Sequence, residues 1–386
     1  MGLPWGCFMN NEMLLARRRI MMTKTVPSYH VWDGSRDYSF YNASASTWYI
    51  DTPEKWAGLC MISLDMAVAD DSGLPSNAKY TMGSKNIEVT EDLYFNDNYT
   101  ENFTWETTYQ NESEKDILNN FAYVLRADGQ RVALYLDAYC QNFNGNFHKI
   151  VGMYASSYSW ARWHPGIIAD PGNNVRNISF EYCTLKNGMT RGTTSESKYS
   201  NYFPSLIYDR SNSATYKNIR AFHCKTIGVC TGNYSGKSLL IGSHNLTPSP
   251  SATMQNLSVQ NCQAMLNFYS GYYGRRQHAF VHNDSENKNY KFIYTFENEN
   301  LVPSQPLVNT YQIRTSSDNR SRTPASESHV YTFGNIGTTT TDETSILQTM
   351  PSKIALIAQV NADITANASG DLSLLDSNGN FTGVCP

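Results

Sequence analysis

The chain has 386 residues and a formal net charge of −4, with 17% charged and 13% aromatic residues. This length allows one elongated repeat structure or two to three compact domains. The charge balance argues against nucleic-acid binding by bulk electrostatics, and the absence of an apolar run of about 18 residues predicts no transmembrane helix and no membrane partner. Abundant Tyr, Thr, Ser and Asn favour an all-β protein with half-exposed strands.

Eight cysteines are spread along the chain without a Cys-x-x-Cys pair, so the sequence lacks the spacing of a zinc site. We expect no metal and no cofactor. The chain is long enough to bury a core without disulfides, and most thiols are expected to be reduced and buried.

Residues 1–27 form a basic segment that includes Arg17, Arg18 and Arg19. These arginines are not followed by the apolar stretch of about 7–15 residues that a secretory signal requires. Two interpretations remain open: the protein is not exported by that route, or this start is not the native one.

Residues 28–170 are predicted to lead into a repeat array and to cap its first end. Thr52 is a suitable N-cap with Pro53 at the first helical position, and Trp56 and Cys60 follow at helical spacing. This is the one helix that we expect. It would cover strand edges that the end of an array otherwise exposes.

Residues 171–300 contain three copies of one pattern, which reads Asn, an aliphatic residue, four further residues and Cys. The copies run from Asn177 to Cys183, from Asn218 to Cys224 and from Asn256 to Cys262. Repeats with a period of about 20–50 residues indicate a solenoid or a related array.

The apolar residues of each copy change phase at the same place. Ile178 and Phe180 share one strand face, but the step from Phe180 to Cys183 is odd. An odd step in a pattern of period two indicates a bend or bulge, as the corner of a coil requires. The sequence therefore predicts an all-β fold, a right-handed parallel β-helix (solenoid) with an N-terminal cap helix.

The repeat is expected to fade after residue 288. A degenerate fourth copy starts at Asn289, with Thr295 in place of Cys. Residues 301–386 are interpreted as a small C-terminal β element that caps the array or associates chains. In this region 337–341 is expected to be a loop or linker, and 354–360 a buried strand.

Two segments resemble a known family. The run that begins with Trp32-Asp33-Gly34-Ser35 and continues through residues 49–59 looks like the start of GLUG-type β-helix proteins of gut bacteria. Residues 143–150 are similar to the turn that precedes their coils, although His148 stands where that family has Asp. The resemblance covers about residues 29–295, and it implies a right-handed β-helix.

Residues 13–22 resemble the start of virion proteins encoded by phages of gut bacteria. This resemblance implies that Arg17, Arg18 and Arg19 dock the chain onto other virion proteins. It also implies assembly in the host cytoplasm, which fits reduced thiols.

The repeated Asn and Cys residues have structural and functional interpretations. Asn177, Asn218 and Asn256 form either an exposed polar row or a structural ladder at a turn, and we favour the ladder because Asn tolerates unusual dihedral angles. The three repeat cysteines should stack about 5 Å apart. We expect an inward stack of thiols rather than a metal site or disulfide, because no His or Asp shares their register.

Two clusters combine aromatic and basic side chains, whose flat rings suit sugars and whose guanidinium groups suit acidic sugars. Their alternative role is loop packing between coils or chains. The candidate glycan-binding residues are Tyr158, Trp160, Arg162, Trp163, Tyr272, Tyr273, Arg275 and Arg276.

An enzyme is the less favoured interpretation. Glycan hydrolysis needs two carboxylates about 5–9.5 Å apart, and the sequence does not pair its candidates. These candidates are Glu88, Glu91, Asp92, Glu181, Asp209, Asp284 and Glu286.

These observations lead to one functional hypothesis and two alternatives. The hypothesis is a structural protein of the virion surface, similar to a tail or head fibre, that contacts host-surface glycans and forms a homo-oligomer, with a trimer suggested by analogy. The alternatives are a bacterial cell-surface adhesin and a glycan depolymerase on a β-helix scaffold.

Overall fold

A computed structural model describes the fold within residues 31–386, the second of two compact units, the first being residues 1–30. The residues described are 29–63, 73–95, 123–125, 131–133, 136–137, 140–156, 166–169, 172–186, 205–209, 214–230, 238–243, 253–268, 278–281, 289–301, 307–308, 326–339, 347–367 and 370–384.

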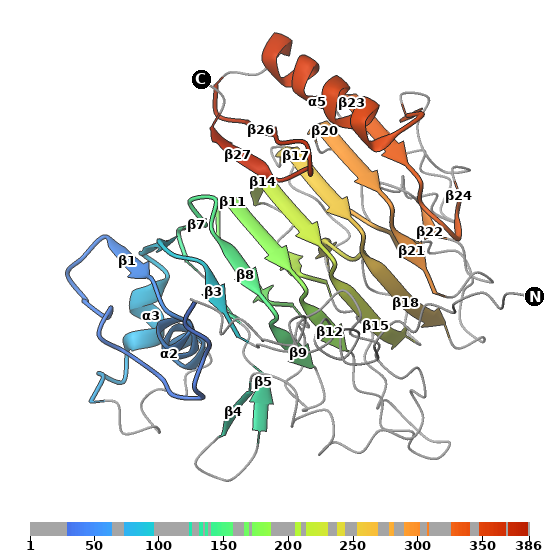
Figure 1. The fold of residues 1–386 in the computed structure, drawn as a ribbon. Helices are drawn as coiled ribbons and strands as arrows, with labels where there is room; N and C mark the ends of the chain where they lie inside the picture. Colours follow the sequence, from blue (N-terminus) through green and yellow to red (C-terminus); the bar gives the residue numbers. More distant parts are fainter. Residues whose placement is uncertain are drawn as a thin grey trace, which may run out of the picture. The chain divides into compact units, whose positions relative to one another are not determined.

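Parallel strands stack coil upon coil in this unit (Figure 1). The long sheet contains β1 (Thr47–Ile50), β2 (Asn86–Val89), β3 (Leu93–Tyr94), β7 (Asn142–Asn144), β8 (Lys149–Val151), β11 (Asn174–Glu181), β14 (Thr215–Phe222), β17 (Thr253–Gln260), β20 (Asn289–Phe296), β23 (Ser326–Phe333) and β25 (Leu347–Thr349).

Three smaller parallel sheets complete the coils. The second sheet contains β9 (Tyr154–Ser156), β12 (Thr184–Lys186), β15 (Lys225–Cys230), β18 (Gln263–Phe268) and β21 (Glu299–Asn300). The third sheet contains β6 (Leu136–Asp137), β10 (Ile168–Ala169), β13 (Ile207–Asp209) and β16 (Ile241–Ser243), and the fourth contains β19 (His278–Ala279), β22 (Leu307–Val308) and β24 (Thr338–Thr339).

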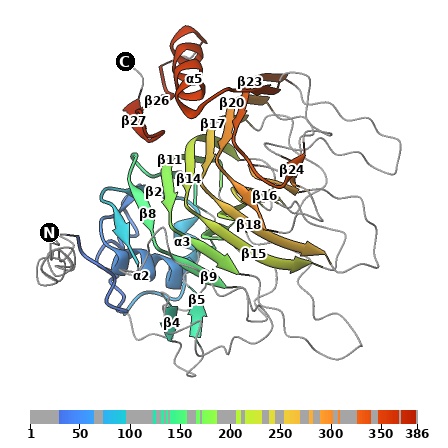
Figure 2. The same cartoon turned by 45° about the vertical axis from the view of Figure 1, so that its right-hand side comes forward.

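From β8 to β23 the chain visits these sheets in a fixed order. It passes from a strand of the long sheet to one of the second sheet, then to the third or fourth sheet, and returns to the next strand of the long sheet. Figure 2 shows the same stack from another side. The prediction of a parallel β-solenoid is therefore confirmed.

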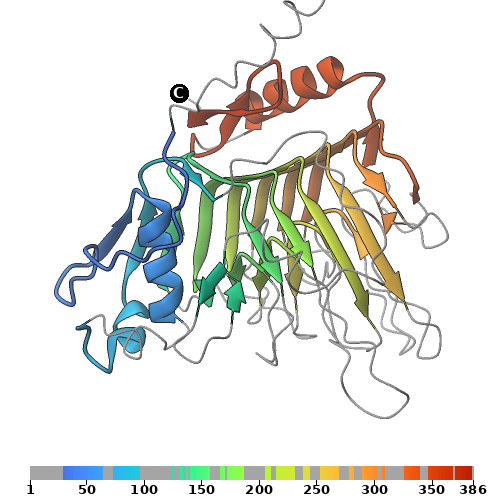
Figure 3. The same cartoon turned by 60° about the horizontal axis from the view of Figure 1, so that its bottom comes forward.

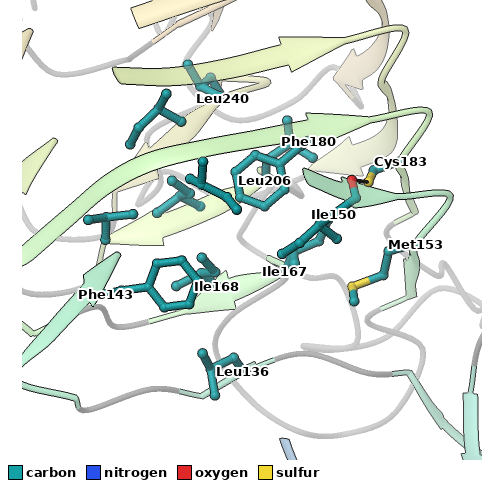
Figure 4. Close-up of a cluster of buried hydrophobic side chains, with 14 of the residues drawn as sticks. Leu136, Phe143, Ile150, Met153, Ile167, Ile168, Phe180, Cys183, Leu206 and Leu240 are labelled. Carbon is teal, nitrogen blue, oxygen red and sulfur yellow. Dashed lines mark hydrogen bonds between the residues drawn. The ribbon is translucent and has the colours of Figure 1, made fainter. Parts of the chain in front are cut away.

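The apolar core lies inside the coils. Ile178, Ile219 and Leu257 are direct partners in β11, β14 and β17, and all three are fully buried. Figure 4 shows the core of the earlier coils, where Phe180 of the long sheet lies among aliphatic side chains such as Leu206. Because equivalent residues stack in register, each coil buries its apolar face against the next.

Each coil of the long sheet from β8 to β23 has two residues with positive φ, five positions apart. The pairs are Phe147 and Gly152, Asn177 and Tyr182, Asn218 and His223, Asn256 and Asn261, Phe292 and Glu297, and His329 and Gly334. The first member interrupts the pairing of the strand, and the second follows its end, where the chain turns toward the second sheet. The corner therefore lies inside the odd step of the apolar pattern.

Two helices cover the first coils. Helix α2 (Pro53–Ser63) starts at the predicted position, where the Lys55 amide donates to Thr52 Oγ1 over 3.2 Å. Its Trp56 is fully buried, and the Trp56 and Phe143 rings are nearly perpendicular with their centroids 6.1 Å apart. Helix α3 (Ala78–Met82) follows, so the expectation of a single helix was wrong.

The C-terminal region contains a long helix where a buried strand was expected. Residues 354–360 lie in α5 (Lys353–Asn367), so that prediction was wrong. Ser352 Oγ accepts from the Ala355 amide over 3.1 Å and caps the helix. An antiparallel hairpin follows, made of β26 (Ser373–Leu375) and β27 (Phe381–Val384). We call α5 with this hairpin the strap.

The strap lies on the outer side of the long sheet, away from the core of the coils (Figure 3). Its apolar side chains form a second buried cluster with residues of β20 and β23. The members of this cluster are Phe292, Tyr294, Phe296, Tyr331, Leu356, Ile357, Val360, Ile364, Leu372 and Leu375.

The repeat extends further than the sequence indicated. Val259 pairs with Thr295, so the residue that takes the place of Cys262 is Asn298 and not Thr295. Strand β23 continues the series within residues 301–386. Thr338 and Thr339, expected in a loop, form β24.

Asn261 offers a direct test of the corner conformation. Its φ is 52°, a region that costs β-branched residues about 1–2 kcal/mol and glycine almost nothing. We predict that Asn261→Val lowers the free energy of unfolding by about that amount, and that Asn261→Gly stays close to the parent. Chemical denaturation of the two variants checks this, and equal losses would contradict the corner assignment.

Candidate functional site

The outer face of the long sheet carries the polar groups that the coils do not need for their core. Successive side chains of a strand point to opposite faces. On β14, Ile219 and Ala221 face the core, which places Arg220 and Phe222 outside. In the register of the long sheet, Arg220 lies beside Ser179 on β11 and beside Ser258 on β17. All three are buried although they face outward.

An asparagine ladder crosses this face. Asn177 Nδ2 donates to Asn144 Oδ1 over 3.0 Å, Asn218 Nδ2 donates to Asn177 Oδ1 over 2.7 Å, and Asn256 Nδ2 donates to Asn218 Oδ1 over 2.7 Å. The hydroxyl of Tyr294 donates to Asn256 Oδ1 over 2.7 Å and ends the ladder. Burial raises the pKa of this hydroxyl, so it stays a donor.

The ladder residues have a structural role in this arrangement. Asn177, Asn218 and Asn256 have φ values of 56°, 52° and 56°. Asn is one of the few residues with a side chain that tolerate this region. Each amide bonds the neighbouring coil, so the same residues that permit the bulge also fix the register.

A buried ion pair lies beside the ladder. Arg220 Nη1 donates to Glu181 Oε1 over 2.7 Å, and Lys149 Nζ lies 3.3 Å from Glu181 Oε2. Arg220 Nη2 also donates to Gln260 Oε1 over 3.4 Å, and its guanidinium lies 4.3 Å from the centre of the Phe222 ring. The side chain of Arg220 is 1% exposed and that of Glu181 9%. Both oxygens of Glu181 are therefore engaged by cations.

A histidine–carboxylate pair lies next to this network. His148 Nδ1 is 3.2 Å from Asp92 Oδ1, which also accepts from the Lys149 amide over 3.1 Å. His148 and Asp92 are about one-third exposed, at 30% and 34%. Lys149 thus connects Asp92, through its amide, with Glu181, through its ammonium group.

The candidate carboxylates are spread over different surroundings. Glu88 Oε2 accepts from Asn146 Nδ2 over 3.5 Å, and Asp209 ends β13 in the third sheet. Asp284 and Glu286 lie outside the described residues. Among the candidate carboxylates whose side chains the structure describes, Glu181 is the buried one, and it pairs with Arg220 and Lys149 in a structural ion pair.

The repeat cysteines stack at the corner that leads to the second sheet. Cys183 Sγ donates to the Ile150 carbonyl over 3.3 Å, and Cys224 Sγ donates to the Phe180 carbonyl over 3.3 Å. Together with Cys262 they are free thiols and almost completely buried. Burial raises the pKa of the Cys183 and Cys262 thiols. Within the described ranges, no group of His, Cys, Asp and Glu is arranged to hold a metal ion.

Two sets of predicted functional residues lie outside the described residues. The glycan-binding set is Tyr158, Trp160, Arg162, Trp163, Tyr272, Tyr273, Arg275 and Arg276, and the docking set is Arg17, Arg18 and Arg19. The strands that bracket the two aromatic clusters are described. Residues 157–165 follow β9, and residues 269–277 follow β18. Both clusters therefore follow a strand of the second sheet, in two different coils; β10 of the third sheet comes after the first cluster, and β19 of the fourth sheet comes after the second.

The buried network was not found from the sequence. Arg220 lies between the apolar Ile219 and Ala221, and this alternation is the signal that places it on the outer face. Its pairing with Glu181 depends on the register between two coils, which one sequence does not give.

Comparison with known proteins gives no relatives: no family model matches the sequence, and no curated protein or solved structure does either. In the part of the chain that the structure describes, no helix is both long and apolar enough to cross a membrane.

The buried ion pair predicts a large effect from removing one partner. Arg220→Met leaves Glu181 buried without its closest cation, and we expect the free energy of unfolding to fall by about 3–5 kcal/mol. The double variant Arg220→Met with Glu181→Leu should recover most of this loss, because it removes both charges. Chemical denaturation measures both variants. A double variant as unstable as the single one would contradict the assignment.

Thiol labelling tests the burial of the cysteines. Burial raises the pKa of the Cys140 thiol to about 12, so at pH 8 the thiol is almost entirely protonated and the reactive thiolate is scarce. We predict that iodoacetamide leaves Cys140 and Cys183 unmodified in the folded chain and modifies both after denaturation. Peptide mass spectrometry measures the fraction of each cysteine that is modified. Rapid modification of Cys140 in the folded chain would contradict its burial.

Proposed function

We propose that this chain is a structural protein of a virion surface, similar to a tail or head fibre, and that its coils display loops that bind host-surface glycans. The observation that supports the proposal is the stacked origin of these loops. In repeat proteins, insertions in successive repeats emerge on one face, which is often the binding face. Here the connections after β9, β12, β15 and β18 all start from neighbouring strands of the second sheet.

The spacing of these strands fits an extended ligand. Strands β9 and β18 are three steps apart in the second sheet. At about 4.8 Å per step, the two strands that precede the aromatic clusters lie about 14 Å apart. A short oligosaccharide spans this distance.

The residue types of the two clusters suit sugars. Trp160, Trp163 and Tyr272 offer rings that pack on a sugar face, and Arg162 and Arg275 offer bidentate donors for the carboxylates of acidic sugars. In this proposal the basic segment with Arg17, Arg18 and Arg19 docks the chain onto other virion proteins, and several copies assemble, with a homotrimer as the suggested state.

Two alternatives share the scaffold and differ in one property each. A bacterial cell-surface adhesin would have the same binding chemistry without the virion. A glycan depolymerase would need a pair of carboxylates, and the engagement of both Glu181 oxygens by Arg220 and Lys149 disfavours a catalytic role for that residue.

A glycan array with the purified chain tests the binding proposal. We expect selective binding of surface glycans, and we expect Trp163→Ala or Tyr272→Ala to weaken it by about 2- to 10-fold, as the loss of one aromatic contact implies. Tyr80→Ala is the matched control, because Tyr80 is an aromatic residue of α3 that is 79% exposed. Equal weakening by all three substitutions, or no glycan binding at all, would refute the proposal.

The same glycans distinguish the alternatives. Release of oligosaccharides on incubation with the chain would establish the depolymerase. Mass spectrometry of purified virions decides between the virion protein and the adhesin, and absence of the chain from virions would contradict the virion assignment.

A further inference from the structure

The strap is held on the long sheet by side chains that bond its main chain. Asn218 Nδ2 donates to the Asp371 carbonyl over 2.9 Å, and Asn218 Oδ1 accepts from the Ser373 amide over 2.9 Å. Asn256 Nδ2 donates to the Ser373 carbonyl over 2.8 Å. The ladder amides therefore bind both the donor and the acceptor of one residue of the hairpin.

The turn of the hairpin is bound in the same way. Gln260 Nε2 donates to the Asn378 carbonyl over 3.0 Å. Gly379 has a φ of 88° and lies so close to the sheet that a Cβ there would be 2.8 Å from Gln260 Oε1 and 2.9 Å from Phe296 Cζ. The main chain of the turn thus rests directly on the outer face.

Helix α5 binds the hairpin from a second side. Asn361 Nδ2 donates to the Leu375 carbonyl over 2.8 Å, and Asn361 Oδ1 accepts from the Leu375 amide over 2.8 Å. Leu372 and Leu375 are the apolar anchors, and both are buried. Four amide side chains, those of Asn218, Asn256, Gln260 and Asn361, therefore bond main-chain groups of the hairpin segment. Two leucines of the segment pack in the second buried cluster.

Among the described strands, none extends the hairpin into a larger sheet. Strands β26 and β27 pair with each other in a separate two-stranded sheet. An isolated two-stranded hairpin is only marginally stable in water. Its conformation therefore depends on the face that binds it, as the conformation of a bound peptide does.

We propose that Asn218, Asn256, Gln260 and Asn361 form a binding face for a peptide main chain, and that the hairpin segment 370–384 of a second copy occupies this face when chains associate. In a single chain, the segment occupies its own face. Amide side chains carry a donor and an acceptor and suit the main chain of either copy equally. Gly370, at the start of the segment, has a φ of 86°, and glycine adopts this and many other backbone conformations without strain, so residue 370 is a joint at which the segment can change direction. This inference does not depend on the glycan-binding proposal.

The test uses the full chain with a protease site in place of residues 368–369. After cleavage, we expect the fragment 370–386 to stay bound on size-exclusion chromatography, because its contacts lie on the body of the protein. A fluorescent synthetic peptide of residues 370–386, with Cys385→Ser, should then replace it, and anisotropy gives the exchange and the affinity. Circular dichroism checks that the cleaved body remains folded.

Changes in the peptide test the recognition without altering the body. Methylation of the Ser373 amide removes the donor to Asn218, and we expect affinity to fall by about 10-fold. Ser377→Ala is the control, because Ser377 is exposed, and it should bind like the parent. Equal binding of the methylated peptide, loss of the fragment without uptake of the free peptide, or unfolding of the body on cleavage would each overturn the proposal.

Discussion

The structure depends on one backbone constraint, the pair of left-handed residues five positions apart in each coil. The first member, such as Asn218, interrupts strand pairing in β14, and the second, His223, follows the end of that strand. A left-handed residue with a side chain is normally unfavourable by about 1–2 kcal/mol. Here each pair stacks on the equivalent pair of the next coil, so the surrounding packing and hydrogen bonds maintain the conformation.

This constraint also determines what the outer face can do. The bulge at the first position presents the asparagine amides as a ladder, and these amides then bind the hairpin main chain. Beyond the ladder, Phe292 and His329 take the same position, and α5 covers that part of the sheet. The face thus changes from amides that bind a main chain to aromatic side chains that bury a helix. The buried pair of Arg220 and Glu181 lies beside the amide part, where it limits the polar groups left for a ligand.

Much of the scaffold could be predicted because the repeats carry it locally. The odd step between Phe180 and Cys183 marked the corner, since side-chain alternation is a property of single strands. The fourth copy was predicted in the wrong register and the coil of β23 was missed, because Phe292 and His329 stand where the earlier copies have Asn, and Asn298 stands where they have Cys. The backbone constraint is shared there, but the residue that meets it is not.

The strap and the buried ion pair depend on tertiary contacts and could not be predicted in the same way. Residues 354–360 form an apolar run that suits a buried strand, and the helix became recognisable only with Ser352 as its cap and Ile364 at helical spacing. Arg220 and Glu181 are 39 residues apart and meet only through the register of two coils. The candidate glycan-binding residues remain a prediction, supported by the stacking of the strands that precede them in the chain.

The most direct test of the central claim is a comparison of two single-glycine insertions in β14. One lies between Arg220 and Ala221, inside the left-handed pair, and the other between Thr215 and Tyr216, before it. Chemical denaturation gives the free energy of unfolding of each. If the five-residue spacing sets the coil, the inner insertion costs several kcal/mol more than the outer one, because it displaces the corner from its neighbours. Equal losses from the two insertions would contradict the claim.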